Sequence, residues 1–284
     1  DIHCHVEPDD TVRLFADDCV IYTTVRAIDD QLRLNTSLTN ISRWCQEWGM
    51  EINVGKTSYM HITRKRAPLK FAYHLKGLHV AEAASVKYLG VTITNTLKWD
   101  VHINQTCTKA YRQLGYLRRK LALALSKVRL TSYKCLVRPI LEYGSVIWNP
   151  HQTYLLNQLE GIQNKALRFV YSQYSRDVNI TALCNRASIQ TLEIRRRIAA
   201  LKFLYLLYHD NININKHKYL KPPYQRSART NHDRSIRPFI TRCNSFKYSY
   251  FPSVIEIWNN LPRDIVSSES LESFTANLEK FLDQ

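Results

Sequence analysis

Two adjacent carboxylates interrupt an otherwise apolar run in the stretch Leu14-Phe15-Ala16-Asp17-Asp18-Cys19-Val20-Ile21-Tyr22. The apolar residues on both sides favour a pleated, half-buried strand. Neighbouring like charges are costly in such a strand unless something neutralises them. A tight turn between two strands avoids this cost by pushing both acids out at its tip. The sequence therefore predicts a β-hairpin that presents Asp17 and Asp18.

This pair of exposed carboxylates is a candidate metal site. Hard cations such as Mg²⁺ bind carboxylate oxygens together with phosphate oxygens and water, an arrangement that suits nucleotide chemistry. We expect Asp17 and Asp18 to be the metal ligands and Mg²⁺ to be the cofactor. The alternative is a plain polar turn, because Asp is a common turn residue and the pair alone is a weak signal.

Charge is divided unevenly along the chain. The 284 residues have a net charge of +16 at pH 7, and their hydrophobic fraction of 45% is ordinary for a globular protein. Residues 1–60 contain ten acidic and five basic side chains, so the excess of positive charge lies entirely in the remaining residues. An acidic tip beside a long basic region suits a polyphosphate partner and a cation. The alternative is that the basic surface serves solubility alone.

Cysteine usage and hydropathy restrict the compartment. The seven cysteines are scattered, odd in number and without a CxxC pair, which indicates reduced core thiols and an intracellular, reducing location. Nucleus and cytoplasmic ribonucleoprotein both stay open. The group His3-Cys4-His5 lacks a matching pair at zinc-site spacing, so a terminal strand is the better interpretation. The longest apolar run, 199–208, is too short for a membrane span, and no membrane partner is expected.

The first ninety-five residues predict short strands around one helix. Residues 2–6 and 11–24 resemble strands joined by the turn Pro8-Asp9-Asp10. An amphipathic helix follows, with Asp29 or Asp30 as its cap, one face formed by Ile28, Leu32, Leu38, Ile41, Cys45 and Trp48, and Gly49 at its end. Further strands are expected at 58–63, at 71–80 around Lys76-Gly77, and at 86–93, where Gly90 marks a bulge or a close backbone approach.

Lys56 is a candidate phosphate contact. The group Gly55-Lys56-Thr57 is not a phosphate-binding loop, because the earlier glycine and the following helix of that motif are missing. Lys56 could still meet a phosphate as a point charge where the chain returns toward the hairpin. A surface lysine in a turn is an equally open alternative.

The order of these motifs resembles the reverse transcriptases of non-LTR retrotransposons of the jockey or CR1 type. The motifs are Phe-Ala-Asp-Asp at 15–18, a Trp-ending helix, Gly-Met-Glu-Ile-Asn-x-x-Lys-Thr at 49–57, and Tyr-Leu-Gly-Val-x-Ile at 88–93. The stretches 136–144 and 251–262 resemble the tail of such elements. The resemblance covers essentially the whole chain, and five motifs in the family's order form a specific signal.

The resemblance implies RNA-templated DNA synthesis by two-metal phosphoryl transfer. It implies that Asp17 and Asp18 hold the metals, that Lys56 lies by the deoxynucleoside triphosphate, and that Tyr88, Leu89 and Gly90 steady the primer. The partners would be an RNA template and a DNA primer. The family also has a third metal-binding aspartate and a nucleotide-selecting helix upstream of the hairpin, whereas only about a dozen residues precede it here. We therefore expect a carboxy-terminal fragment that lacks the upper palm and fingers and is inactive alone.

After residue 95 the pattern becomes helical and basic. Apolar residues repeat at helical spacing from Ile103 to Leu121, and further helices are expected near 127–137, 152–171 and 188–209. The basic side chains on their outer faces are candidate nucleic-acid contacts, because the first of these helices holds no acid after Asp100. They are Lys109, Arg112, Arg118, Arg119, Lys120, Lys165 and Arg168.

The last segment is expected to be a basic tail ending in a helix. Residues 210–247 interleave Arg226, Arg229, Arg234, Arg237 and other cations with aromatic rings such as Tyr224 and Phe239, a pattern that suits single-stranded nucleic acid or a flexible linker. Ser270 caps a final helix with Leu271, Phe274, Leu278 and Phe281 inward.

The whole sequence predicts an α+β fold in three parts. Residues 1–95 form a partial palm with a small antiparallel sheet, 96–209 a helical, thumb-like region, and 210–284 the basic tail. The function expected is that of an RNA-directed DNA polymerase fragment. The alternatives are a non-catalytic nucleic-acid-binding module and a degenerate transposon relic.

Overall fold

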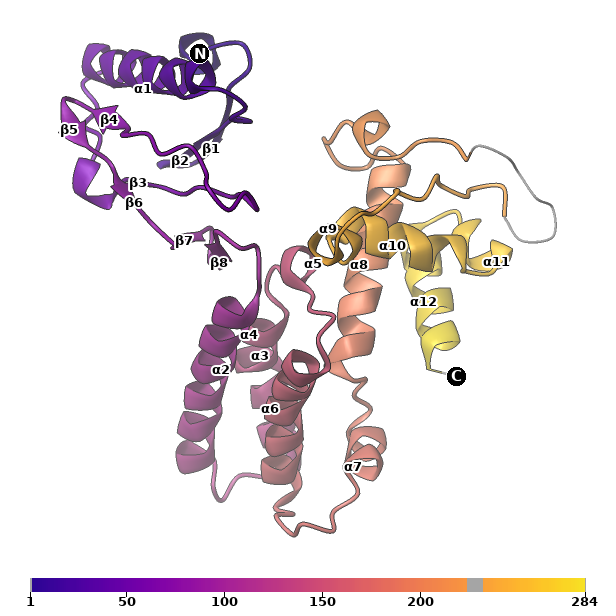
Figure 1. Ribbon diagram of the computed structural model, residues 1–284. Coiled ribbons are helices and arrows are strands. Elements are labelled where there is room, and N and C mark those ends of the chain that lie inside the picture. The colour runs from indigo at the N-terminus through magenta and orange to yellow at the C-terminus, as the bar shows by residue number, and fades with distance from the viewer. Residues whose placement is uncertain (1, 224–231, 284) are drawn as a thin grey trace. The chain divides into compact units, whose positions relative to one another are not determined.

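A computed structural model describes residues 2–223 and 232–283. The chain divides into two compact units, Asp1–Lys98 and Trp99–Gln284 (Figure 1). The first is built from short strands and one long helix, and the second contains helices and loops in its described residues. The mixed α/β character that the sequence predicts is confirmed. The finer division into three parts stays a prediction.

Unit 1 contains one long helix and eight short strands. The long helix is α1 (Ile28–Glu47). The strands are β1 (Thr11–Phe15), β2 (Asp18–Tyr22), β3 (Ser58–Tyr59), β4 (His74–Leu75), β5 (Leu78–His79), β6 (Ala81–Glu82), β7 (Ser85–Tyr88) and β8 (Val91–Thr94). They pair as four two-stranded ribbons: β1–β2, β4–β5 and β7–β8 are antiparallel, and β3–β6 is parallel. The expected small sheet is therefore a set of separate ribbons.

The β1–β2 hairpin rests on α1 through a small apolar core. Val12 and Ile21 are cross-strand partners, and they pack with Ile41 and Cys45 of α1. Burial is confined to the base of the hairpin: Val12 is only 2% exposed, whereas Leu14 and Phe15 near the tip are 47% and 64% exposed. The hairpin therefore projects its tip away from the core that anchors its base.

Several predictions for unit 1 need correction. Residues Ile2–His5 form a 3-10 helix, not a strand, and Ile2 is the residue of this helix that reaches the core. The stretch 58–63 keeps only two residues in a strand, after a 3-10 turn at Val54–Lys56. Gly90 marks no bulge, because Leu89 and Gly90 are the two turn residues of the β7–β8 hairpin. Ile28, Leu32 and Trp48, expected on the apolar face of α1, are exposed.

Unit 2 is built from helices that bury their apolar faces against one another. Its longer helices are α2 (Asp100–Lys120), α3 (Ser126–Leu136), α6 (Thr153–Tyr171), α8 (Leu192–Tyr208), α10 (Tyr250–Asn259) and α12 (Leu271–Leu282). The shorter ones are α4 (Arg138–Glu142), α5 (Ser145–Trp148), α7 (Ile180–Ala187), α9 (Asn244–Lys247) and α11 (Arg263–Val266). Every apolar residue predicted to face inward on α6, from Leu155 to Phe169, is buried. No helix in the described residues is long and apolar enough to span a bilayer.

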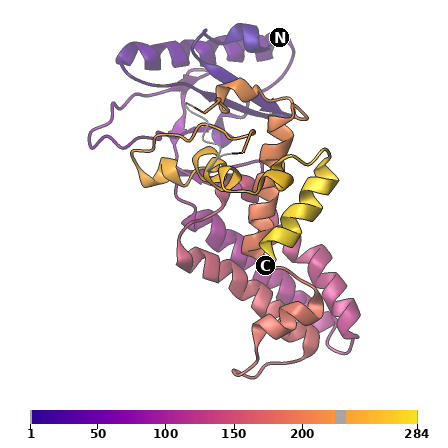
Figure 2. The same ribbon diagram turned by 90° about the vertical axis from the view of Figure 1, so that its right-hand side faces the viewer.

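The helices of unit 2 meet in two places. The helices α2, α3 and α6 pack against one another, and Tyr133 of α3 donates a hydrogen bond to Gln163 of α6 over 2.8 Å inside that core. The second core joins α8 to α10 and α12 around Trp258 and Phe274, and both views show α12 alongside α8 (Figures 1 and 2). The helix predicted near 188–209 is α8, which begins at Leu192, because Ser188 has a left-handed backbone that ends α7 and Thr191 caps α8.

The described part of the tail is packed and not free. Arg234 donates to the carbonyl of Val266 over 2.7 Å, and Arg237 donates to the carbonyl of Pro222 over 3.0 Å. Phe239 packs on the apolar core of α8 and α10. These three side chains therefore support the fold. Tyr224, Arg226 and Arg229 lie outside the described residues.

Candidate metal hairpin and nucleic-acid interface

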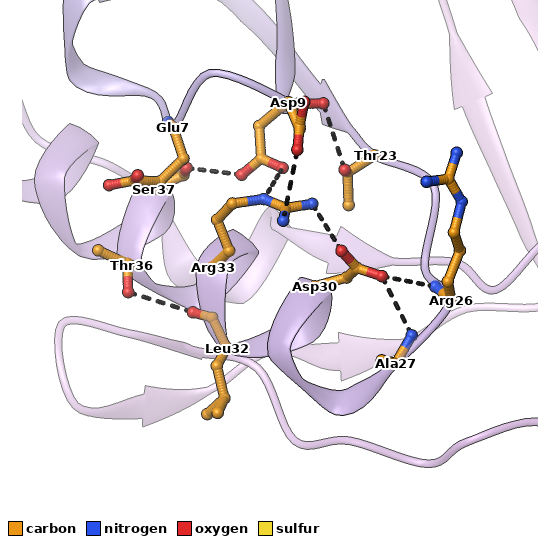
Figure 3. Close-up of polar contacts among 11 residues, drawn as sticks. Glu7, Asp9, Thr23, Arg26, Ala27, Asp30, Leu32, Arg33, Thr36 and Ser37 are labelled. Carbon is orange, nitrogen blue, oxygen red and sulfur yellow. Dashed lines mark hydrogen bonds and ion pairs between the residues drawn. The ribbon is translucent and has the colours of Figure 1, made fainter.

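The base of the β1–β2 hairpin is held by a polar network around Arg33 of α1 (Figure 3). Arg33 lies 2.9 Å from Asp30 and 3.6 Å from both Asp9 and Asp10, as measured between nitrogen and carboxylate oxygen. Ser37 donates to the buried carboxylate of Asp10 over 2.6 Å. The network ties the turn before β1 to one side of α1, and it fixes the direction in which the hairpin leaves the unit.

Asp30 also closes the start of α1. Its carboxylate accepts hydrogen bonds from the backbone N–H groups of Arg26 and Ala27, over 2.7 and 3.1 Å (Figure 3). These bonds, reinforced by Arg33, lower the pKa of Asp30 below its usual range. Of the two caps that the sequence left open, Asp30 therefore makes the capping contacts.

The tip of the hairpin is a two-residue turn. Phe15 pairs with Asp18, so Ala16 and Asp17 form the turn itself. Ala16 has a left-handed backbone with φ of 51°, a conformation that normally favours glycine. Asp17 and Asp18 are both exposed, as predicted. Among the residues that the structure describes, neither carboxylate has a hydrogen bond or an ion pair within the protein.

These two carboxylates fit one half of a magnesium site. Mg²⁺ is commonly held by one or two carboxylates and completes its coordination with phosphate oxygens and water. The exposed pair at 17–18 supplies the carboxylates and leaves room for such ligands. No cluster of three or more His, Cys, Asp or Glu side chains suited to a metal occurs in residues 2–223 and 232–283. The described residues therefore place two carboxylates at the tip and no third candidate ligand with them.

The other predicted residues of unit 1 lie on separate turns. Lys56 ends the 3-10 turn that Asn53 caps, and its side chain is exposed. Leu89 and Gly90 form the tip of the β7–β8 hairpin with φ of 46° and 82°, and Tyr88 precedes them at the end of β7. Within the described residues, no hydrogen bond or ion pair joins Lys56 to the acids at 17–18.

The predicted basic face of α2 is confirmed as solvent-facing. Lys109, Arg112, Arg118, Arg119 and Lys120 are all exposed, opposite a buried side that includes Ile103 and Leu114. On α6, Lys165 is exposed and lies over the ring of Tyr111, with its ammonium 4.7 Å from the ring centre. Arg168 is committed within the protein, because it donates to the carbonyl of Ser175 over 2.9 Å.

Two shallow grooves follow the junction of α2 and α6. The first, of about 510 Å³, is lined by Tyr111 and Arg112 of α2 and by Gln158 and Lys165 of α6, among others. The second, of about 650 Å³, is lined by Tyr111, Arg118 and Arg119 and by Tyr174 after α6. Tyr111 lines both grooves, so they adjoin there, and we call the two together the α2–α6 groove.

Sequence reasoning missed three residues of this groove. Tyr111 and Tyr174 come from positions 63 residues apart, and only the packing of α2 on α6 brings their rings to one surface. Arg129 is buried at the floor, where it donates to the carbonyls of Leu121, Ala122 and Phe169 and to the hydroxyl of Ser172. The alternation of Tyr and Arg at 111, 112, 116, 118 and 119 was the available clue to an aromatic and basic surface.

Comparison with known proteins bears on unit 1 most directly. Residues 2–93 match the family described as reverse transcriptase (RNA-dependent DNA polymerase). This match contains the Asp17–Asp18 hairpin, Lys56 and the turn at 88–90. Residues 2–93 are therefore similar to reverse transcriptases.

Relatives identify the type of element. The chain is 28% identical over 162 residues to the probable RNA-directed DNA polymerase from transposon BS of Drosophila melanogaster, an alignment covering 55% of this chain and 18% of that protein. It is 29% identical over 161 residues to the corresponding protein of transposon X-element, with the same coverage. It is 25% identical over 170 residues to that of the mobile element jockey, covering 57% and 18%.

These matches confirm the resemblance that the motif order indicated. The chain is related to RNA-directed DNA polymerases of jockey-like non-LTR retrotransposons. It spans less than a fifth of the length of these curated relatives. No solved structure matches the chain.

Proposed function

We propose that Asp17 and Asp18 are metal-binding carboxylates of an RNA-directed DNA polymerase that extends a primer 3′-OH on an RNA template. The observation that carries this proposal is the exposed tip at 15–18, where two acids without partners in the described residues follow a left-handed alanine. A non-glycine residue in that conformation is strained, and such strain persists where the surrounding structure imposes it, often at functional sites. The tip lies within the residues that match the reverse transcriptase family.

Asp17 and Asp18 would hold Mg²⁺, with Asp17 the more direct ligand because it occupies the turn itself. When bound, the metal supplies charge neutralisation for phosphoryl transfer. The protein's own part is to keep the two carboxylates outward on a hairpin whose base is fixed by Asp10, Arg33 and Ser37. A fixed base limits how far the acids move when a triphosphate arrives.

The remaining residues of unit 1 have supporting roles in this proposal. Lys56 would meet the triphosphate as an exposed point charge. The turn of Tyr88, Leu89 and Gly90 would steady the primer end with its backbone, as the family resemblance implies. We assign residues 1–95 to a partial palm, 96–209 to a thumb-like region and 210–284 to a tail that packs on it.

The helices of unit 2 would bind nucleic acid through the basic face of α2. That face presents Lys109, Arg112, Arg118, Arg119 and Lys120, and α6 adds Lys165. Cations clustered without carboxylates attract phosphates and release counterions on binding. Arg168 is a weaker candidate, because a backbone carbonyl already occupies part of its guanidinium. The partners proposed are an RNA template and a DNA primer, with no membrane, inside a reducing compartment where the free cysteines persist.

We infer that the 284 residues expressed alone do not polymerise, because the described residues place two acids at the tip and no third. The test is primer extension on an RNA template with purified protein, Mg²⁺ and deoxynucleoside triphosphates. No incorporation is expected. Robust incorporation of nucleotides would overturn the inference of inactivity. If Asp17→Asn abolished that incorporation, the result would support the metal role of Asp17.

A second candidate function is a nucleic-acid-binding module without catalysis. The basic, carboxylate-free face of α2 favours it, since this face does not depend on the hairpin. Two results would favour this function over the polymerase. The protein would bind nucleic acid in a salt-dependent way that Asp17→Asn leaves unchanged, and a chain extended upstream would still incorporate no nucleotides. A degenerate relic would show no cooperative melting by circular dichroism.

A further inference from the structure

We propose that the α2–α6 groove binds a single strand of nucleic acid, with bases stacked on Tyr111 and Tyr174. This inference deepens the proposed nucleic-acid binding of α2 and rests on it, but it is independent of the metal hairpin. Single-strand binding differs from duplex binding, because a duplex is contacted mainly by cations at its phosphates and does not stack on exposed rings.

The groove is long enough for several nucleotides. Its lining runs from Cys107, in the first half of α2, to Ala122 just after the helix ends, and Tyr111 lines both sections. At ~1.5 Å per helical residue this is a path of about 22 Å. In both views α6 lies beside α2 along this path (Figures 1 and 2).

The charge of the lining favours a polyanion. Arg112, Lys165, Arg118 and Arg119 lie along the path, and no carboxylate lines either section in the described residues. We do not count Arg129 among the phosphate contacts, because protein oxygens accept all the hydrogen bonds that it makes. Its side chain forms part of the groove wall. The four remaining cations are placed to follow a phosphate backbone.

Two tyrosine rings stand in this basic path. Tyr111 is 47% exposed and Tyr174 is 54% exposed, so both offer ring surface to a ligand. Lys165 lies 4.7 Å from the ring centre of Tyr111, and the guanidinium of Arg118 lies 5.5 Å from that of Tyr174. Each ring is thus paired with a cation. The cation stabilises the position of the ring and is placed to contact the phosphate next to a stacked base.

The exposed rings distinguish a single strand from a duplex. Bases stack on aromatic side chains when they are unpaired, whereas a duplex offers mainly its sugar–phosphate surface and groove edges. The α6 side of the groove is open at Gly161, where an added Cβ would meet nothing within 4 Å. Stacking is tolerant of sequence, so we expect little base specificity.

The test measures binding of the full chain by fluorescence anisotropy. The probes are labelled oligonucleotides of about 15 residues: poly-uridine RNA, poly-thymidine DNA, and a mixed-sequence duplex of equal length. The variants are Tyr111→Leu and Tyr174→Leu. The matched control is Tyr116→Leu, because Tyr116 is a 48% exposed tyrosine of α2 that does not line the groove in the described residues. Thermal melting of each variant confirms that it folds.

We expect each groove variant to weaken single-strand binding by about tenfold, and duplex binding by less than about twofold. The control stays within about twofold of the parent. The RNA and DNA arms decide whether the 2′-hydroxyl contributes. Arg118→Gln should weaken every probe and reduce the salt dependence, whereas Lys280→Gln on α12 should not.

Two outcomes would overturn the inference, and they are distinguishable. Preferred duplex binding, with single-strand affinity unaffected by both tyrosine variants, would refute the stacking path and leave the proposed nucleic-acid function intact. Absence of binding to all three probes at low salt would refute both the inference and the nucleic-acid function of unit 2.

Discussion

Ser37 donates a hydrogen bond to the carboxylate of Asp10 over 2.6 Å, and this contact joins the residue before β1 to the middle of α1. The hydroxyl also accepts from the backbone N–H of Glu7 over 3.0 Å. Both Ser37 and Asp10 are buried. Since Thr11 begins β1 directly after Asp10, the pair fixes the base of the hairpin that carries the paired acids.

Ser37→Ala is therefore expected to destabilise unit 1 by about 1–3 kcal/mol, because it leaves a buried carboxylate oxygen and a backbone donor without their partner. Urea unfolding, followed by circular dichroism, measures the change. The control is Thr36→Ala, which removes an exposed hydroxyl bonded within the same helix and should cost less than about 0.5 kcal/mol. Equal losses for the two variants would show that the Asp10 contact adds nothing to stability.

Asp30 gives unit 1 a pH dependence of known sign. The N–H groups of Arg26 and Ala27 lower its pKa, so its charged form is favoured in the folded state. A lowered folded pKa gives stability that is present above the unfolded value of about 3.9 and is lost as pH falls through the folded value. Asp30→Asn should therefore melt lower than the parent at pH 7, and the two melting temperatures should converge below about pH 3. A difference that is constant from pH 7 to pH 3 would contradict this.

Periodic patterns allowed much of this structure to be predicted. The 4, 3, 4 spacing of apolar residues gave α2, and the apolar positions of α6 from Leu155 to Phe169 are buried as expected. The hairpin at 15–18 was predicted from a conflict between strand propensity and adjacent charges, which only a turn resolves. In each case one local rule was sufficient, and no distant residue was needed.

Other features depend on distant residues and could not be predicted from local patterns. The arginines at 195–197 lie near the start of α8, where the helix dipole disfavours positive charge unless an anion or water offsets it. Arg195 pairs with Glu142, and Arg196 is 1% exposed with its Nε 3.0 Å from Asn149. The groove tyrosines are similarly far apart in sequence, and only the packing of two helices brings them together.

The Arg195–Glu142 pair leads to a prediction on stability. The two carboxylate oxygens of Glu142 accept from Nε and Nη2 of Arg195, and both side chains are largely shielded from water. Glu142→Gln should destabilise unit 2 by about 1–3 kcal/mol, because it leaves a shielded guanidinium without its charged partner. Denaturant unfolding at low and high salt measures the effect.

The same helix offers a matched control for this pair. Arg197 and Glu193 lie 3.8 Å apart with much greater exposure, and such surface pairs contribute little. Glu193→Gln should cost less than about 1 kcal/mol, and high salt should remove the loss. If the two substitutions lower the free energy of unfolding equally at high salt, shielding from water does not explain the contribution of the Arg195–Glu142 pair.

Leu89 occupies a turn position that suits asparagine better. Its φ of 46° precedes Gly90 at 82°, the pattern of a two-residue hairpin turn for which Asn-Gly is the preferred pair. Leu89→Asn should stabilise the β7–β8 hairpin by roughly 0.5–1 kcal/mol, because leucine pays a steric cost in this conformation. Thermal melting checks this, with Lys87→Gln as a nearby control without a turn role. A lower melting temperature for Leu89→Asn would show that the leucine side chain supports the fold.

Substitution of the tip carboxylates should weaken metal binding without lowering the stability of the fold. Asp17→Asn and Asp18→Asn each remove a charge that has no partner in the described residues and that repels its neighbour, so neither variant should melt lower than the parent without metal. Mn²⁺, as a paramagnetic substitute for Mg²⁺, should broaden the amide resonances of Ala16–Cys19 in the parent. Each variant should lose this broadening, because one remaining carboxylate holds the ion weakly. Asp29→Asn, an exposed acid at the start of α1, should retain it. If the broadening persists when both acids are replaced by asparagine, the metal binds elsewhere. The basis for assigning these two acids to catalysis would then be lost.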